Sequence, residues 1–135
     1  MSPPKTPLLT VDCVVVDPGL GVLMVRRKNP PFKGELALPG GFVDIGETVE
    51  EAAKRELMEE TGLEATTLRL VGVYSKPDRD PRGHTCSVAF LADVRNKDAK
   101  AGDDAAAVAW VKDLGGVAIA FDHRDIITDA LNLIR

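Results

Sequence analysis

The stretch GFVDIGETVEEAAKRELMEETGL, residues 41–63, decides the fold of this chain. It predicts a helix from Thr48 to Thr61, because Thr48 and Glu51 have the spacing of a capping box and Gly62 stands where a left-handed helix C-cap is expected. Gly40 and Gly41, just before the helix, supply a tight backbone bend that lets a ligand approach the main chain closely. The stretch therefore predicts a well-bounded helix that is entered from a glycine-containing loop.

Helical periodicity places three glutamates of this helix on the side that should face the protein. That face carries Val49, Ala52, Ala53, Glu56, Leu57, Glu59 and Glu60, and the opposite face carries Glu50, Glu51, Lys54, Met58 and Thr61. A solvated surface helix is the simpler interpretation of an acidic run, but it would place the acids beside Lys54. Clustered carboxylates repel one another, and burial raises their pKa values unless a cation lies among them. Because glutamate oxygens are preferred ligands of Mg²⁺, the cluster predicts a metal site.

Two charged residues flank the acidic face. Glu47 lies just before the helix cap, and Arg55 stands at the edge of the acidic face. An arginine in this place can pair with Glu47 or with a metal-binding glutamate and hold it in one rotamer. An ordinary surface arginine is the alternative interpretation.

Residues 41–63 resemble the Nudix box, in which these residue types recur at fixed spacing. The matching positions are Gly41, Glu47, Arg55, Glu56, Glu59, Glu60 and Gly62, with aliphatic Leu57 and Leu63 between and after them. Each polar or glycine position is matched by chance roughly once in 15, so the joint chance is on the order of one in 10⁸. This is a specific signal.

The resemblance implies both a fold and a reaction. The fold is of the α+β class, an α/β/α sandwich with a mixed sheet between helices and a loop–helix–loop metal site. In the reaction, water attacks a phosphorus of a diphosphate bridge while Mg²⁺, or Mn²⁺, stabilises the charge. The resemblance implies Glu56 and Glu60 as metal ligands, Glu59 as a third ligand or a proton acceptor, a carbonyl of Gly40 or Gly41 in the metal shell, and Glu47 and Arg55 as orienting catalytic residues.

The box does not identify the general base. Glu59 is one candidate, and Asp103 and Asp104, in the turn KAGDDAAA, are the others. A polar turn between two strands is the alternative interpretation of those aspartates. Ala107 stands where similar chains carry glutamate, which removes a metal ligand or a base unless Asp103 or Asp104 serves instead.

Two further segments resemble those of small ADP-ribose pyrophosphatases of this family. They are residues 36–44, LALPGGFVD, and residues 74–85, YSKPDRDPRGHT. In the second, Arg79, Arg82 and His84 are predicted to meet phosphate or ribose oxygens. A charged hairpin loop with internal Asp–Arg pairing is the alternative. Leu36, where tryptophan is frequent, and Ile45, where an acid is common, depart from this pattern.

Four more candidates come from the strands and loops outside the box. Arg26 and Arg27 end a predicted strand, so their side chains should point to opposite faces, and one of them is expected to reach a phosphate. Phe32 and Trp110 are candidates for stacking on a base, and a core position is the alternative for both, which Trp110 fits better. His123, beside a helix cap, is expected to be structural.

The remaining patterns predict one domain over residues 1–135 with strands before and after the central helix. Strands are expected at 8–17 and 21–27, which form a hairpin, and at 67–74, 84–94 and 107–111; Asp122 is expected to cap a last helix that ends near Ile134. Cys13 and Cys86 fit buried free thiols. The net charge of -4, without a basic stripe, argues against a nucleic-acid partner. No apolar run reaches membrane-span length and no signal core appears, so a cytoplasmic location without membrane association is expected.

These observations predict a metal-dependent pyrophosphohydrolase of a nucleoside diphosphate linked to another moiety. ADP-ribose, cleaved to AMP and ribose 5-phosphate, is the first candidate substrate. The alternatives are a pyrophosphohydrolase of nucleoside triphosphates, including oxidised ones, and a non-catalytic nucleotide sensor with the same fold. The partner is a small molecule, and the family resemblance also allows a homodimer.

Overall fold

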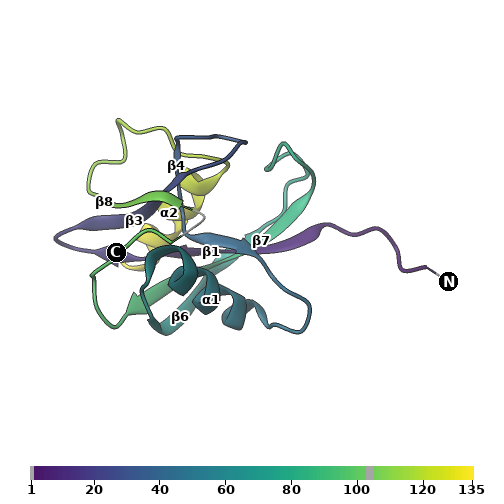
Figure 1. Cartoon of the computed structure of the whole chain (residues 1–135), viewed down its shortest axis with the longest axis horizontal. Helices are drawn as coiled ribbons and strands as arrows, with labels where there is room; N and C mark the ends of the chain where they lie inside the picture. Colours follow the sequence, from purple (N-terminus) through teal and green to yellow (C-terminus); the bar gives the residue numbers. More distant parts are fainter. Residues whose placement is uncertain (1, 103–104) are drawn as a thin grey trace.

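The computed structural model describes residues 2–102 and 105–135. Strands precede and follow a central helix, and a second helix closes the chain (Figure 1). In chain order the elements are β1 (Leu8–Val14), β2 (Val16–Asp17), β3 (Gly21–Arg27), β4 (Leu36–Ala37), β5 (Gly40–Phe42), α1 (Val49–Thr61), β6 (Ala65–Tyr74), β7 (Thr85–Val94), β8 (Ala105–Val111) and α2 (His123–Leu133). The predicted elements are all present, and β6 and β8 each begin two residues earlier than expected.

The strands form two sheets. The first has the order β5-β1-β7-β6, in which β1 and β7 are parallel and the other pairs are antiparallel. The second has the order β2-β3-β4, and β8 pairs with β3. The mixed sheet and the α/β/α sandwich that the family resemblance implies are therefore observed.

The expected strand over residues 8–17 is divided at Val15. β1 belongs to the first sheet, whereas β2 forms the short antiparallel pair with β3 in the second. Val15 joins them, and its carbonyl accepts a hydrogen bond from the N–H of Leu23 at 3.0 Å. The predicted hairpin is thus limited to β2 and β3, because the chain leaves the first sheet at this point to enter the second.

The two helices cover opposite faces of the first sheet. Successive side chains of a strand point to opposite faces. Accordingly Cys13 packs in the core that contains Leu57 of α1, whereas Val14 packs in the core that contains Ile127 of α2. Trp110 lies partly buried against the α1 core, as expected. Cys13 is buried, while Cys86 is only partly buried.

The ends of α1 form as predicted. Thr48 accepts a hydrogen bond from the N–H of Glu51 at 3.1 Å, Glu51 accepts one from the N–H of Thr48 at 2.9 Å, and Gly62 is left-handed with φ 73°. The placement of Thr61 on the exposed face was wrong. Thr61 is fully buried, because its hydroxyl donates to the carbonyl of Leu57 and lets the last turn pack inward.

Asp122 occupies the N-cap position of α2, but its side chain makes no capping hydrogen bond. The expected capping role is therefore wrong. The carboxylate of Asp122 instead accepts two hydrogen bonds from Arg79, which draws it away from the helix N–H groups. In the described part of the chain, neither helix is long and apolar enough to cross a membrane.

Candidate active site

Two glycines in β5 bring the backbone against two glutamates of α1. The N–H of Gly40 donates to the carboxylate of Glu60 at 3.1 Å. A Cβ on Gly41 would lie 2.6 Å from the carboxyl carbon of Glu56 and within 2.8 Å of both its oxygens. Such contacts are closer than real Cβ atoms make, so glycine at 41 is what lets the Glu56 carboxylate rest on β5. The loop and the helix meet at Glu56 and Glu60.

The guanidinium of Arg55 links the loop to the acidic face. Its Nε and Nη2 donate to the two carboxylate oxygens of Glu47 at 2.6 and 2.8 Å, and Nη1 donates to Glu56 at 2.8 Å and to Glu59 at 3.2 Å. Nη2 also donates to the carbonyl of Phe42 at 3.0 Å. The hydrogen bonds from Arg55 lower the pKa of Glu47 to about 2. The bidentate pair with Glu47 holds the guanidinium of Arg55 in the orientation in which it hydrogen bonds Glu56.

The three helical glutamates have different surroundings. The side chain of Glu56 is 14% exposed, and burial raises its pKa against the opposing effect of Arg55. Glu60 is half-buried. The side chain of Glu59 is 56% exposed, so its predicted placement on the protein-facing side was wrong. Its position lies 200° around the helix from buried Leu57.

The arrangement at Glu56 and Glu60 fits a divalent cation. Over residues 2–102 and 105–135, no three His, Cys, Asp or Glu side chains converge closely enough to hold an ion, and Glu56 and Glu59 share a nitrogen of Arg55 instead. Yet burial raises the pKa of Glu56, so this carboxylate would gain from a further positive neighbour. Because Gly41 has no side chain, its backbone lies close to the Glu56 carboxylate. Backbone and carboxylate oxygens in close proximity are the ligands that a hard cation requires.

Of the candidates for the general base, Glu59 lies within the described residues. Asp103 and Asp104 lie outside them. The segment before them is tied to the end of α1, where the N–H of Gly102 donates to the backbone carbonyl of Glu60 at 2.9 Å. Ala107 is exposed on β8 and pairs with Arg26 of β3.

The two other departures from the family pattern have contrasting positions. Leu36 is 4% exposed and packs in the α2 core. Ile45 is fully exposed in the loop before α1. Neither side chain lines the cavities described below.

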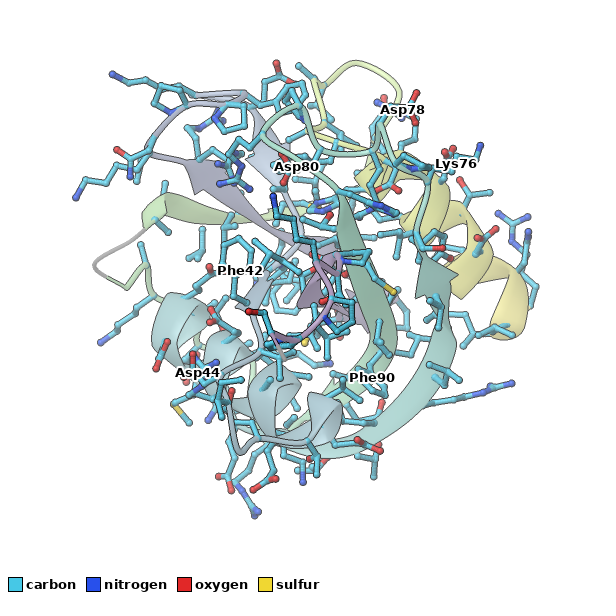
Figure 2. All side chains as sticks on the ribbon, turned by 90° about the vertical axis from the view of Figure 1, so that its right-hand side faces the viewer. Phe42, Asp44, Lys76, Asp78, Asp80 and Phe90 are labelled. Carbon is cyan, nitrogen blue, oxygen red and sulfur yellow. The ribbon has the colours of Figure 1, made fainter. Side chains whose placement is uncertain are left out.

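The loop between β6 and β7 forms a wall opposite the box. Its residues Lys76 and Asp78 run beside α2, whereas Asp44 lies at α1 (Figure 2). Arg79 reaches inward with a side chain that is 5% exposed. It donates to both carboxylate oxygens of Asp122 at 2.7 and 2.9 Å and to the hydroxyl of Thr85 at 2.8 Å. Arg79 is therefore held by the protein itself.

Arg82 and His84 lie closer to solvent. The side chain of Arg82 is 49% exposed and donates to both oxygens of buried Asp80 at 2.8 and 3.1 Å. This is the internal Asp–Arg pairing that the sequence left open. The ring of His84 is exposed and hydrogen bonds through Nε2 with the carbonyl of Ser75.

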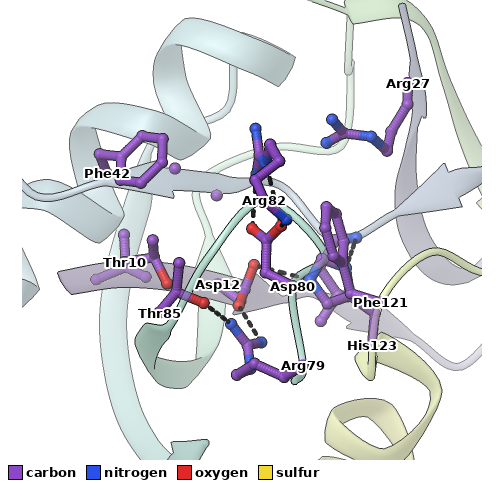
Figure 3. A pocket seen from close by; sticks show the side chains of 14 residues that line it. Thr10, Asp12, Arg27, Phe42, Arg79, Asp80, Arg82, Thr85, Phe121 and His123 are labelled. Atoms are coloured by element: carbon purple, nitrogen blue, oxygen red, sulfur yellow. Dashed lines mark hydrogen bonds and ion pairs between the residues drawn. The ribbon is translucent and has the colours of Figure 1, made fainter. Parts of the chain in front are cut away.

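Two cavities border this loop, and the first lies between the loop and the box. We call the first the inner cavity; it measures about 80 Å³ and is lined by Thr10, Asp12, Gly40, Gly41, Arg79 and Arg82 among others (Figure 3). We call the second the outer groove; it measures about 700 Å³ and is lined by Phe32, Tyr74, Lys76, Asp78 and Asp125 among others. Arg79 and Phe121 line both. The inner cavity thus borders the glycines of the box on one side and the outer groove on the other.

Arg26, Arg27 and Phe32 lie on the β3 side of these cavities. Arg27 lines the inner cavity, with its guanidinium 4.9 Å from the ring centre of Phe121. Arg26 is exposed and donates to the carbonyl of Gly34, so the two arginines do point in different directions. Phe32 lines the outer groove and makes an edge-to-face contact with Phe121 at 4.9 Å.

A buried polar cluster beneath the inner cavity was missed by the sequence reasoning. The carboxylate of Asp12 accepts a hydrogen bond from the hydroxyl of Ser87 at 2.5 Å and lies 3.3 Å from Nε2 of His123. Nδ1 of His123 accepts a hydrogen bond from the N–H of Leu38 at 2.9 Å, two residues before Gly40. Burial acts to raise the pKa of Asp12, but His123, Ser87 and Arg79 hold it below its ordinary value.

The sequence did contain a signal for this cluster. Thr10 and Asp12 alternate with apolar residues in an otherwise apolar strand, as do Thr85 and Ser87 in β7. Alternate polar residues on two central strands share one face, which a purely apolar core would not tolerate. No comparable signal marked Phe121, which lies in a loop with φ 54°.

Comparison with known proteins agrees with this geometry. The NUDIX domain model matches residues 6–114. A Methanocaldococcus jannaschii protein named ADP-ribose pyrophosphatase is 52% identical over 124 residues, which is 91% of this chain and 72% of the relative. An ADPR-responsive transcriptional repressor from Acinetobacter baylyi is 35% identical over 93% of this chain, and this chain spans about half of it, 53%.

The fold comparison gives the same result. The crystal structure of the NUDIX domain of Shewanella oneidensis NrtR, complexed with ADP ribose, superposes with a TM-score of 0.89 at 30% identity. The match covers 97% of this chain and 90% of that one. Because the domain model spans most of the sequence, and because the glutamates and glycines of the box meet in space, the chain belongs to the NUDIX domain family of hydrolases.

Proposed function

We propose that this Nudix hydrolase cleaves the diphosphate of ADP-ribose to AMP and ribose 5-phosphate, with Mg²⁺ or Mn²⁺ held at Glu56 and Glu60. One observation carries the proposal. Gly41 closely approaches the Glu56 carboxylate, and the Glu60 carboxylate accepts a hydrogen bond from the N–H of Gly40. Both glycines line the inner cavity. The 52% identical relative named ADP-ribose pyrophosphatase supports the choice of substrate.

The residues of the box have different roles in this proposal. When bound, a divalent ion stabilises negative charge on the phosphoryl oxygens and activates the attacking water. Glu56 and Glu60, with the backbone at Gly40 and Gly41, are the groups that hold it. Arg55, fixed by Glu47, keeps the Glu56 carboxylate in one orientation. Glu59 is exposed enough to accept a proton from the water, or it serves as a third ligand.

The arginines and aromatic residues around the two cavities bind the rest of the substrate in this proposal. Arg27, Arg79 and Arg82 line the inner cavity, and Phe32 offers an aromatic surface to a base in the outer groove. Arg26 lines a pocket of about 90 Å³ with Glu60 and Gly40, and His84 lines another pocket with Arg82. These two residues are proposed as contacts at the rim.

A non-catalytic ADP-ribose sensor is the second candidate. The observation in its favour is the 35% identical relative named as an ADPR-responsive repressor. The complete set of box glutamates favours the enzyme, because a binding protein has little need of a partly buried carboxylate beside two others.

A product assay separates the candidates. Purified protein with Mg²⁺ is incubated with ADP-ribose and, separately, with nucleoside triphosphates, and the products are identified. We expect AMP and ribose 5-phosphate from ADP-ribose. Pyrophosphate released preferentially from a triphosphate would overturn the substrate, and tight ADP-ribose binding without turnover would favour the sensor.

The variant Glu60→Gln tests the metal assignment. It should lose turnover by about 100-fold or more, since even outer-shell partners of a metal contribute 10- to 100-fold, while its thermal unfolding stays near that of the wild type. Glu64→Gln is the matched control, because Glu64 is exposed just after the helix and pairs with Arg95. Activity of Glu60→Gln near that of the wild type would remove Glu60 from the site.

A homodimer belongs to the same proposal. Leu70 and Val73 of β6 are 56% and 58% exposed, and they supply apolar surface for an interface between copies. Sedimentation of the wild type against a Leu70→Glu variant tests it, and a wild-type monomer would refute it.

A further inference from the structure

The segment that carries the site glycines crosses from one sheet to the other. β4 lies in the second sheet, whereas β5, which contains both glycines, lies in the first. Two residues, Leu38 and Pro39, make the crossing. The carbonyl of Pro39 accepts a hydrogen bond from the N–H of Cys13 at 2.8 Å, and the N–H of Leu38 donates to Nδ1 of His123 at 2.9 Å. The position of β5 therefore depends on the groups that hold these two residues.

The hydrogen bond between Leu38 and His123 is buried. The two residues are 3% and 5% exposed, and the N–H of Leu38 has no other acceptor within residues 2–102 and 105–135. Because Nδ1 accepts this bond, the ring proton lies on Nε2, which is 3.3 Å from Oδ1 of Asp12. A buried backbone N–H group that loses its partner is costly, so the segment would shift to find another one.

Asp12 supports the same segment from β1. It is paired with Gly40 across β1 and β5, and a Cβ on Gly40 would lie 2.7 Å from Oδ1 of Asp12. Asp12 and His123 both line the inner cavity (Figure 3). The carboxylate of Asp12 also accepts a hydrogen bond from the hydroxyl of Ser87 at 2.5 Å and lies 3.9 Å from the guanidinium of Arg79. Asp12 therefore keeps two partners when the ring of His123 is changed.

A small displacement of β5 is enough to alter the acidic site. The N–H of Gly40 donates to the carboxylate of Glu60 at 3.1 Å, near the long end of the roughly 2.7–3.2 Å range of such bonds. The backbone of Gly41 lies against the carboxylate of Glu56. Since Leu38 is only two residues before Gly40, a shift at Leu38 is passed directly to both contacts.

We propose that His123 is a positioning residue for the metal site, because its Nδ1 fixes Leu38 and thereby holds the glycines of β5 against the acidic face of α1. This inference rests on the proposed function, which places the metal at Glu56 and Glu60. The first residue of α2 thus contributes to a site that β5 and α1 form. His123 itself does not touch the metal or the substrate in this proposal.

Two amide variants separate the two contacts of His123. Oδ1 of asparagine is the same number of bonds from Cα as Nδ1 of histidine, so His123→Asn keeps an acceptor for the N–H of Leu38. Nε2 of glutamine corresponds in the same way to Nε2 of histidine, so His123→Gln keeps a donor to Asp12 and loses that acceptor. Each variant loses one buried hydrogen bond, so both should melt a few degrees below the wild type.

Binding of Mn²⁺ to the protein without substrate measures the effect on the site. Electron paramagnetic resonance of the free ion and calorimetry both give the dissociation constant. We expect His123→Gln to bind Mn²⁺ about tenfold more weakly, the lower end of what partners of metal ligands contribute, and His123→Asn to stay within about threefold of the wild type. Ser87→Ala is the matched control, because it removes a buried hydrogen bond to Asp12 without touching Leu38 and should also stay within about threefold.

Turnover provides a second readout. Saturating Mg²⁺ should restore most of the ADP-ribose hydrolysis of His123→Gln, because the metal ligands themselves are unchanged. Turnover that stays low at saturating Mg²⁺ would place the defect outside metal binding and would overturn the proposal.

The Mn²⁺ affinities of the variants decide the positioning role. Equal affinities of His123→Gln and His123→Asn would overturn it, because the contact with Leu38 would then have no separate effect. A loss of affinity in His123→Asn would overturn it by itself, so the proposal can be refuted even if His123→Gln fails to fold. If the wild type binds Mn²⁺ and cleaves ADP-ribose, these results concern His123 alone. If the wild type neither binds Mn²⁺ nor cleaves ADP-ribose with Mg²⁺, the proposed function falls as well.

Discussion

Gly41→Ala is the change that most directly tests how the backbone shapes the active site. The added Cβ would lie 2.6 Å from the carboxyl carbon of Glu56. An ordinary contact begins at 3.4 Å, so the carboxyl group must move by about 0.8 Å. A misplacement of about 1 Å in a catalytic group can cost about 100-fold in rate, which corresponds to about 2.7 kcal/mol in the barrier. We therefore expect Gly41→Ala to lower kcat/KM for ADP-ribose by about 100-fold.

The fold should tolerate this change. The atoms in the way belong to the end of a flexible side chain, and the backbone of Gly41 is not in the left-handed region. The cost of an off-rotamer Glu56, about 1 kcal/mol, is offset by the lower entropy of the unfolded alanine chain. The melting temperature should therefore stay within about 4 °C of the wild type.

The assay measures kcat and KM with Mg²⁺ alongside a thermal unfolding curve. Gly116→Ala is the matched control, because a Cβ there meets no atom within 4 Å and its φ is not positive. Wild-type activity in Gly41→Ala would refute the argument that Glu56 rests on β5. A collapse in stability would instead assign Gly41 a structural role.

Two further predictions concern the charged groups around the site. The folded state depresses the pKa of Glu47 from 4.5 to about 2, so the stabilisation is fully present above pH 4.5 and is lost as the pH falls towards 2. Urea unfolding of Glu47→Gln should therefore show a shallower loss of stability over this pH window than that of the wild type. Parallel stability curves for the two proteins would contradict the pairing with Arg55. Arg79→Met should lower the free energy of unfolding by about 3 kcal/mol, because it leaves the carboxylate of Asp122 without its partner. Adding Asp122→Asn should recover part of that loss in denaturant unfolding, and a single variant as stable as the wild type would show that the pair is dispensable.

The local signals in the sequence were sufficient to predict α1 and the inward-facing positions of Glu56 and Glu60 on it. The capping box and the left-handed Gly62 depend on contacts within four residues, so they form wherever the chain folds. The pairing of Arg55 with Glu47 was predicted as one of two alternatives, because the two residues are only eight positions apart in the sequence. The family fold followed from the box and agrees with the observed sheets.

Longer-range features escaped the sequence reasoning. Thr61 was placed on the exposed face because periodicity alone does not show where the next strand crosses, and in the structure its hydroxyl turns back onto Leu57. Asp122 was expected to cap α2, but Arg79, 43 residues earlier, takes its carboxylate. A charge partner so distant in sequence cannot be identified from local spacing.

The sequence by itself determined the box, the helix that carries it and the chemical types that the site contains. The tertiary structure alone decided that Thr10 and Asp12 lie beside Thr85 and Ser87, that His123 reaches the N–H of Leu38, and that Phe121 separates two cavities. The physical reason is the range of the interactions. Caps and helix faces are set by neighbours along the chain, whereas a buried polar row needs two strands more than 70 residues apart to pair in one register.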